Sequence, residues 1–278
     1  MITHPNCKIN LGLHVMRKRP DGYHDLETIF LPMPLFDTLE ITPSEQLTFL
    51  QEGTPLDCDK DHNLCIKALR LLKQDFPEMG NVAIRLKKEI PTGAGMGGGS
   101  ADAAFTLKML NELFSLHLGI PQLERYAASL GADCAFFIQN QPAYGTGIGD
   151  VLEPIDMSCL NGYKFVFVKP QEAVSTAEAY RGAKPRNKWN HTPQTDLREA
   201  VKRPVAEWKE CIVNDFESSI FPNHVAIAHC KQMLYDSGAL YASMTGSGAT
   251  VFGIFPQESD NKPALMGNYY VNNLFVHF

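Results

Sequence analysis

The segment most able to do chemistry is a run of glycines in the first half of the chain. Between Gly93 and Gly99 stand five glycines, interrupted only by Ala94 and Met96. Each glycine costs a folded chain backbone entropy, so such a run indicates a need for positive φ angles or for close approach to bare backbone. The run follows a strand-like segment and opens a helix-like one, where free N–H groups and the positive end of a helix dipole favour a phosphate. We therefore expect a phosphate-binding loop, with an ordinary flexible loop as the alternative.

Two well-known phosphate-binding patterns fit this run incompletely. The P-loop pattern needs a lysine directly after its glycines, and none follows here. Gly93, Gly95 and Gly98 match the G-x-G-x-x-G pattern of dinucleotide-binding folds, which also need an acidic residue about 20 positions on, at the end of the next strand. Residues 111–116 stand there and have a helical pattern, which argues against a dinucleotide site.

Lys8 and Asp133 are charged residues that each allow a chemical and a structural interpretation. Lys8 belongs to an alternating segment in which Asn10 points to the same face of a strand. Asp133 stands in an otherwise apolar stretch, and a carboxylate there could accept a proton from a substrate. The alternatives are an exposed lysine on an edge strand and an aspartate that ends a turn or caps a helix.

Tyr23 and His24 follow a turn signal at residues 21–22 (Asp-Gly). An aromatic ring offers a stacking face for a base, and an imidazole offers one hydrogen-bond donor and one acceptor. The pair is therefore a candidate for base recognition.

Strand-like and helix-like patterns alternate around these residues. Strand patterns cover residues 8–15, 24–30, 39–42 and 82–90, and helix patterns cover residues 63–73, a segment opening near Ser100, and 122–130. The glycine run thus lies between a strand and a helix, whose start Ser100 or Asp102 would cap or complement in charge.

The pattern changes after residues 145–149 (GTGIG). Residues 163–168, 240–244, 250–255 and 268–278 have strand patterns, and residues 225–235 have a helix pattern. We expect the basic, proline-interrupted segment 181–209 to be a solvated surface. A boundary near residues 153–162 would divide the chain into domains 1–155 and 156–278.

The composition restricts the class of protein. The 278 residues correspond to one or two domains of about 150 residues, and 44% hydrophobic with 20% charged residues is typical of a globular protein. No apolar stretch reaches about 18 residues and no signal-peptide pattern is present, so we expect no membrane association. The net charge of −6 argues against nucleic acid as a partner. Seven scattered cysteines without a C-x-x-C pair argue against disulfides and a zinc site and indicate a cytoplasmic protein.

Three segments together resemble the GHMP kinases, small-molecule kinases named for galactose, homoserine, mevalonate and phosphomevalonate. Residues 91–101 (PTGAGMGGGSA) are similar to the ATP loop of that family, and residues 5–11 (PNCKINL) and 244–250 (MTGSGAT) to two further motifs. The resemblance implies an α+β, two-lobed GHMP kinase fold. Its N-terminal lobe would be of the ribosomal-S5-domain-2 type and bind ATP, and its C-terminal lobe would be a ferredoxin-like α/β sandwich.

Further segments resemble those GHMP kinases that act on 4-diphosphocytidyl-2-C-methyl-D-erythritol. They are residues 8–15 (KINLGLHV), 19–24 (RPDGYH), 130–137, 145–149 and 214–217 (NDFE). The resemblance departs from the family pattern at Asn6, Cys7 and Ala135, none of which removes a reactive group. It implies ATP-dependent phosphorylation of the substrate's 2-hydroxyl, in the methylerythritol phosphate (non-mevalonate) route to isoprenoid precursors.

The resemblance also implies roles for individual residues. Lys8 and Asp133 match the catalytic pair, with Asp133 accepting the hydroxyl proton and Lys8 as the cation beside it. The expected nucleotide-binding residues are Asn63, Pro91, Thr92, Gly93, Ala94, Gly95, Met96, Gly97, Gly98, Gly99, Ser100 and Ala101. The expected substrate-binding residues are Asn10, Tyr23, His24, Thr176 and Tyr180, where Tyr180 is the second stacking ring or else a buried structural tyrosine.

The cofactors expected from the resemblance are ATP and Mg²⁺. The Ser100 hydroxyl would contact a phosphate-bound Mg²⁺ or cap the helix, and residues 246–248 (Gly-Ser-Gly) would wall the active site or form a simple β-turn. The expected partners are a cytidyl diphosphate sugar alcohol and ATP, without nucleic acid or membrane, and the expected state is a monomer or weak homodimer.

Two other functions remain open at this point. One is a kinase of another small alcohol, of the homoserine or mevalonate type, against which Tyr23 and His24 argue because those substrates have no cytosine. The other is a nucleotide-binding regulator without catalysis, against which the presence of Lys8, Asp133 and the full glycine run argues.

Overall fold

The computed structural model describes residues 1–55, 60–186, 196–259, 270–276 and 278. The chain forms two compact units and passes repeatedly from one to the other. The first unit comprises Met1–Lys8, Leu35–Thr92 and Gly97–Gln141, and the second comprises Ile9–Pro34, Gly93–Met96 and Pro142–Phe278. Both contain helices and strands, which confirms the predicted α+β class. The glycine run contributes residues to each unit.

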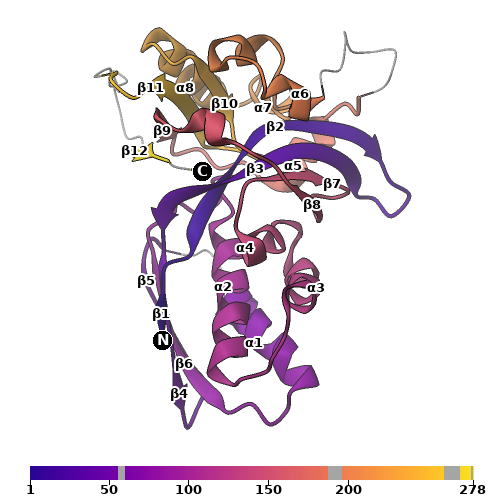
Figure 1. The fold of residues 1–278 in the computed structure, drawn as a ribbon, viewed down its shortest axis with the longest axis vertical. Coiled ribbons are helices and arrows are strands. Elements are labelled where there is room, and N and C mark those ends of the chain that lie inside the picture. Colours follow the sequence, from indigo (N-terminus) through magenta and orange to yellow (C-terminus); the bar gives the residue numbers. More distant parts are fainter. Residues whose placement is uncertain (56–59, 187–195, 260–269, 277) are drawn as a thin grey trace. The chain divides into compact units, whose positions relative to one another are not determined.

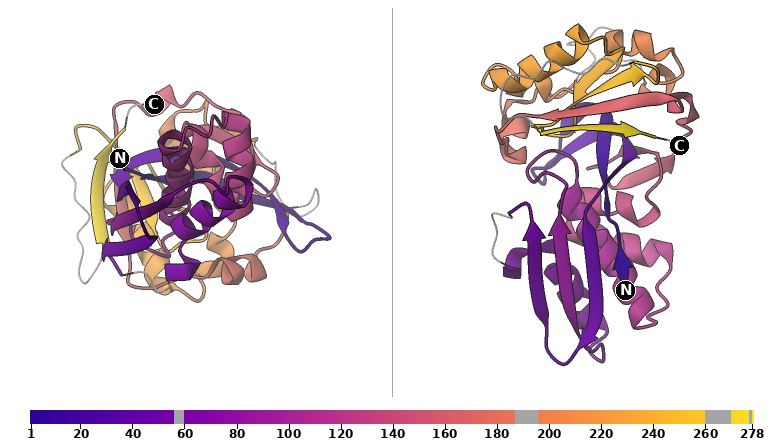
Figure 2. Two further views of the ribbon diagram at one scale, coloured as in Figure 1. Left: turned by 90° about the horizontal axis from the view of Figure 1, so that it is seen from below. Right: turned by 90° about the vertical axis from the view of Figure 1, so that its left-hand side faces the viewer.

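The first unit is a four-stranded sheet with helices on one face (Figures 1 and 2). The strand order is β1 (Ile2–Thr3), β4 (Thr38–Ser44), β6 (Asn81–Lys88) and β5 (Thr48–Gly53), with only β5 and β6 parallel among its described pairs. The helices are α1 (Leu64–Asp75), α2 (Gly98–Leu113), α3 (Ile120–Leu130) and α4 (Phe136–Gln139), with short 3-10 helices at Lys60–His62 and Ala132–Cys134. Alternate residues of β6 (Val82, Ile84 and Leu86) are buried, as a half-buried strand requires.

The second unit contains an antiparallel sheet and helices packed on it. The strand order is β10 (Tyr241–Met244), β11 (Val251–Pro256), β9 (Tyr163–Lys169) and β12 (Tyr270–Phe275). The helices are α5 (Thr176–Gly182), α6 (Leu197–Ala200), α7 (Glu217–Ile220) and α8 (Val225–Asp236), with 3-10 helices at Ser158–Leu160 and Val205–Glu210. Helix α8 packs on β9, β10 and β11.

The long strands β2 (Asn6–Lys18) and β3 (His24–Phe36) belong mostly to the second unit. They form a second sheet with β7 (Ala143–Thr146) and β8 (Val151–Pro154), in the order β2-β3-β7-β8. The hairpin between β7 and β8 uses Gly147 and Gly149, both at positive φ, where glycine is favoured.

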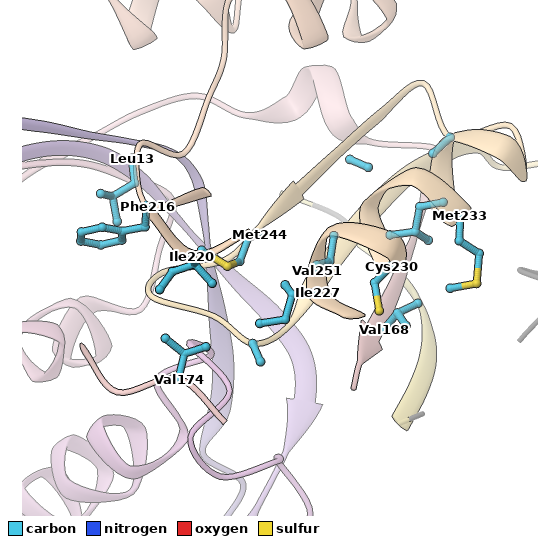
Figure 3. Packing of buried hydrophobic residues seen from close by; sticks show 14 of the residues in the cluster. Leu13, Val168, Val174, Phe216, Ile220, Ile227, Cys230, Met233, Met244 and Val251 are labelled. Atoms are coloured by element: carbon cyan, nitrogen blue, oxygen red, sulfur yellow. The ribbon is translucent and has the colours of Figure 1, made fainter. Parts of the chain in front are cut away.

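A hydrophobic cluster joins α8 to the antiparallel sheet and to β2 (Figure 3). Ile227, Cys230 and Leu234 of α8 follow each other at helical spacing and are completely buried. They share the cluster with Val168 of β9 and Leu13 of β2, among others. Burial of this apolar stripe stabilises a helix of only three turns, which would be marginal alone.

The predicted elements are confirmed, most of them with shifts of one or two residues. The main exceptions are β2 and β3, which continue to Lys18 and Phe36, beyond their predicted ends at residues 15 and 30. Two further details are corrected. Helix α2 begins at Gly98 with Gly97 as its N-cap, so neither Ser100 nor Asp102 caps it. The segment 181–209 is only partly a solvated surface, because Arg186 is buried and paired with Asp215 at 2.7 Å. Residues 187–195 of that segment, and residues 268, 269 and 277 of the last predicted strand, lie outside the described residues. Within the described part of the chain, no helix is long and apolar enough to span a membrane.

We expect Ile227→Ala to lower the free energy of unfolding by about 2–5 kcal/mol, because it leaves a cavity beneath α8. Val225→Ala on the same helix is the control, since Val225 is 71% exposed and its truncation leaves no cavity. Urea unfolding monitored by circular dichroism measures both. Equal losses in the two variants would contradict the core assignment.

Candidate active site

Lys8 and Asp133 form an ion pair in the first unit. The Nζ atom of Lys8 lies 3.1 Å from Oδ2 of Asp133, and the exposed fractions of the two side chains are 3% and 37%. Lys8 stands near the start of β2, and Asp133 lies in the 3-10 helix Ala132–Cys134. The pair combines a buried cation with a carboxylate that a ligand can still reach.

Gly97 packs directly on the Lys8 side chain. A Cβ atom at Gly97 would lie 3.0 Å from Cε of Lys8 and 3.1 Å from Cε2 of Phe137, and the φ angle of Gly97 is +70°. Only glycine meets both conditions without strain. The end of the glycine run therefore fixes the path of the lysine side chain toward Asp133.

The start of helix α2 has the properties of an anion site. Its N-cap Gly97 is left-handed and makes no side-chain capping bond, and the first helical bond runs from the Ala101 N–H to the Gly97 carbonyl at 2.9 Å. The N–H groups of the first helical residues have no intrahelical acceptor, and the helix dipole adds positive charge there. The Ser100 hydroxyl, in this first turn, interacts with the Cys134 thiol, whose pKa is raised to about 12 by burial.

A buried charge cluster in the first unit joins the strand before the glycine run, β6, to the helix after it, α2. Lys88, at the end of β6, pairs through Nζ with Asp37 and, at 2.7 Å, with Oδ2 of Asp102 in α2. The other carboxylate oxygen of Asp37 accepts the backbone N–H groups of Glu89 at 2.6 Å and Ile90 at 2.9 Å. Burial raises the pKa of the Asp102 carboxyl. Sequence reasoning missed this cluster, because Asp102 was assigned to the helix start.

The first half of the glycine run packs against the C-terminal glycine motif in the second unit. Thr245 Oγ1 donates to the Gly95 carbonyl at 3.3 Å and accepts the Asn10 N–H at 3.0 Å. The Thr250 N–H donates to the Ala94 carbonyl at 3.3 Å. A Cβ atom on Gly95, whose φ is +72°, would lie 2.2 Å from the Thr245 carbonyl oxygen. Two motifs 150 residues apart in sequence therefore depend on each other.

The motif at residues 214–217 positions the Gly-Ser-Gly loop. Asn214 Nδ2 donates to the carbonyls of Met244 at 2.7 Å and Gly246 at 2.8 Å. Glu217 Oε1 accepts the Met244 N–H at 2.8 Å. The motif was noted in the sequence only as a resemblance, and its structural role depends on contacts that no local pattern records.

His24 and Tyr180 lie together in the second unit. Their rings stack with centroids 4.9 Å apart and planes at 19°, and Phe216 packs against Tyr180 edge to face at 4.8 Å. Burial and the charge of Lys18 lower the pKa of His24, which keeps a donor and an acceptor on the ring at neutral pH. Thr176 is beside Ser247, with their hydroxyl oxygens 3.2 Å apart.

The remaining candidates occupy separate places. The Tyr23 residue is 61% exposed and takes no part in the ring pair that the structure describes. Asn63 caps helix α1 by accepting the Cys65 N–H at 2.8 Å. Asn10 Nδ2 donates to Thr28 Oγ1 at 3.0 Å, so its amide is oriented by the neighbouring strand.

Comparison with known proteins gives consistent matches over most of the chain. The model of the GHMP kinases N terminal domain matches residues 63–143, and that of the GHMP kinases C terminal domain matches residues 197–265. The 4-diphosphocytidyl-2-C-methyl-D-erythritol kinase of Bacteroides fragilis (strain ATCC 25285) is 52% identical over 267 residues, covering 94% of this chain and 95% of its own. The enzyme of that name from Parabacteroides distasonis is 51% identical over 262 residues, 94% of each chain. A crystal structure of a 4-(cytidine 5'-diphospho)-2C-methyl-D-erythritol kinase matches with a TM-score of 0.76 and 30% identity, covering 91% of this chain and 90% of its own.

Replacing Gly97 tests its contact with Lys8. We expect Gly97→Ala to destabilise the fold by about 2–4 kcal/mol, through left-handed strain plus overlap with the lysine side chain. Gly93→Ala is a matched control, because Gly93 has a similar φ of +58° with nothing within 4 Å of the added atom, and strain alone costs about 1–2 kcal/mol. Urea unfolding gives both values, and equal losses would refute the contact.

The charge cluster predicts an asymmetry between its members. Lys88→Met leaves two buried carboxyl groups without their cation and should cost about 3–5 kcal/mol. Asp102→Asn leaves the Lys88–Asp37 pair intact and replaces a carboxylate whose Oδ1 has no partner among the described residues, so it should cost less than about 2 kcal/mol. Denaturant unfolding at pH 7 measures both, and a greater loss for Asp102→Asn would contradict the arrangement.

Proposed function

Because this chain belongs to the GHMP kinase family, and within it to the 4-diphosphocytidyl-2-C-methyl-D-erythritol kinases, we propose that the residues described above carry that enzyme's reaction. The chain is an ATP-dependent small-molecule kinase. It phosphorylates the 2-hydroxyl of the cytidyl substrate in the methylerythritol phosphate pathway, and kinases of homoserine or mevalonate and a non-catalytic regulator are not favoured.

The Lys8–Asp133 pair is the observation that carries the mechanism. The Asp133 carboxylate is exposed enough to reach a substrate hydroxyl and accepts its proton. The hydroxyl oxygen then bonds to the γ-phosphorus of ATP, the bond between that phosphorus and the β,γ-bridging oxygen breaks, and ADP leaves. Lys8 orients the carboxylate through their ion pair and stabilises negative charge on the phosphoryl group.

The glycine run binds the nucleotide in this proposal. Residues 91–101 supply backbone N–H groups to the phosphates at the start of α2, and Asn63 contributes from the start of α1. Mg²⁺ prefers oxygen ligands and often uses a single protein oxygen plus phosphates, so the Ser100 hydroxyl is a suitable donor to it. The cation, when bound, neutralises charge on the transferring phosphates.

The cytidyl substrate binds to residues of the second unit in this proposal. His24 and Tyr180 provide the neutral imidazole and the aromatic face for cytosine, with Tyr23 exposed beside His24. Thr176 and Asn10 offer hydrogen-bonding groups to the rest of the substrate.

The broader properties stay predictions. They are an ATP-binding lobe of residues 1–155 and a second lobe of residues 156–278, a monomer or weak homodimer, and a cytoplasmic location. Wall formation by residues 246–248 belongs to the same group.

A substrate panel tests the function. Purified protein with ATP and Mg²⁺ should release ADP with the cytidyl substrate, and not with homoserine, mevalonate or no acceptor. Turnover on another alcohol would refute the roles of His24 and Tyr180, and ATP binding without any turnover would favour the regulator.

Asp133→Asn tests the proposed base within the same assay. It should reduce kcat by about 10²–10⁴-fold, since the amide cannot accept the proton. ATP affinity, measured by calorimetry, should stay within about threefold of the wild type. A kcat close to that of the wild type would refute the assignment.

A further inference from the structure

His224 bridges two glutamates in the second unit. Its Nδ1 lies 2.9 Å from Oε2 of Glu172, and its Nε2 lies 2.9 Å from Oε1 of Glu178. His224 is the N-cap residue of α8, Glu178 lies in the first turn of α5, and Glu172 belongs to the connection between β9 and α5. The imidazole thus joins α8 to both sides of the start of α5.

This geometry requires a protonated imidazole. A neutral ring has one N–H and one bare nitrogen, so one of the two carboxylates would face a lone pair instead of a donor. The hydrogen bond to Glu178 is the largest cause that raises the pKa of His224; burial opposes it, and Glu172 raises the pKa further. Two further ionisable groups among the described residues interact with this cluster. Lys169 donates to the backbone carbonyl of Glu172 at 3.5 Å, and the charge of Glu172 contributes to the raised pKa of the Cys230 thiol.

Helix α5 needs such an attachment. It has seven residues, too few to be stable alone in water. Its C-terminal half is held by α7, because Ser219 Oγ donates to the Ala179 carbonyl at 3.1 Å and Gly182 packs against Ser219. Its first turn is held by the Ser175 cap and by the pairing of Glu178 with His224.

The first turn of α5 leads into side chains of the proposed substrate site. Thr176 is beside Ser247, and Tyr180 stacks on His24. Glu178 stands between them in sequence and is directed to α8 instead. A change at His224 therefore reaches the substrate side chains through two residues of one short helix.

We propose that protonated His224 is a positioning residue, which holds α5 so that Thr176 and Tyr180 can bind the cytidyl substrate. The inference rests on the proposed function of those two side chains. Because the imidazolium is the form favoured by folding, its stabilisation is complete below the ordinary histidine pKa of about 6.5 and is lost as pH rises through the raised value. Substrate affinity should therefore fall with rising pH, without a matching change for ATP.

Steady-state kinetics from pH 6 to pH 9 test the proposal. In the wild type, KM for the cytidyl substrate should rise about three- to tenfold over this range, a modest change because both glutamates are more than a third exposed. In His224→Gln, KM for the cytidyl substrate should already be raised at pH 6, and its further change with pH should reflect only the titration of other groups. The ratio of the substrate KM of His224→Gln to that of the wild type cancels the titration of His24, which both proteins share.

His229→Gln is the matched control. His229 lies on the same helix and is exposed, so this variant should keep the wild-type KM profile. The pH profiles of kcat and of KM for ATP should coincide in all three proteins. A ratio of substrate KM values between His224→Gln and the wild type that does not vary with pH would overturn the proposal.

Hydrogen–deuterium exchange of α5 separates this inference from the proposed function. After correction for the intrinsic pH dependence of exchange, the α5 amides of the wild type should lose protection between pH 6 and pH 9. The α5 amides of Glu178→Gln should show no such change. Glu178→Gln also replaces His224→Gln as the test variant if the latter folds poorly. If α5 shows this pH-dependent exchange but the protein does not turn over the cytidyl substrate, the proposed function is refuted, and the inference that protonated His224 holds α5 is upheld. If α5 protection in the wild type does not change with pH, the inference fails whatever the substrate.

Discussion

A lysine ammonium taken out of water needs carboxylate partners, and this requirement organises the first unit around the start of α2. Lys8 and Lys88 are both almost fully buried, and aspartates are placed beside each of them. One lysine packs on Gly97 at the helix start, and the other pairs with Asp102 inside the same helix. The N-terminal turn of α2 is therefore held from two sides without a capping side chain, which would compete with a phosphate for its N–H groups.

Local patterns predicted the longer elements and missed several short ones, among them the strands β5, β7 and β8 and the helices α5, α6 and α7. The alternation at residues 82–90 and the helical spacing at 225–235 reflect which face is buried, and the structure places β6 at Asn81–Lys88 and α8 at Val225–Asp236. The pairing of Lys8 with Asp133 is different in kind, because periodicity carries no information on residues so far apart. This pairing was predicted only because Lys8 and Asp133 match motifs of a known family, in which the two positions meet in the fold.

The errors concern polar residues whose partners are distant in sequence. Serine has a strong preference for helix N-caps, yet Gly97 takes that place because its left-handed backbone fits against the Lys8 side chain. Asp102 is buried because it pairs with the buried Lys88 ammonium. The Arg186 side chain is withdrawn from solvent, unlike the surface expected for its segment, because Asp215 accepts two of its N–H groups. In each case the local preference is worth about 1 kcal/mol, less than a buried charge loses without its partner.

The hydrogen bonds of Asn214 to the backbone around the Gly-Ser-Gly loop have a consequence for how such sequences can diverge. Its amide contacts the carbonyl oxygens of Met244 and Gly246, atoms that every amino acid carries. The side chain at position 244 can therefore change within the limits of its own packing, and the amide still finds its acceptor. Such a contact leaves no correlated substitution between its two ends. Methods that infer proximity from paired changes would be blind to it, although it joins residues 30 positions apart.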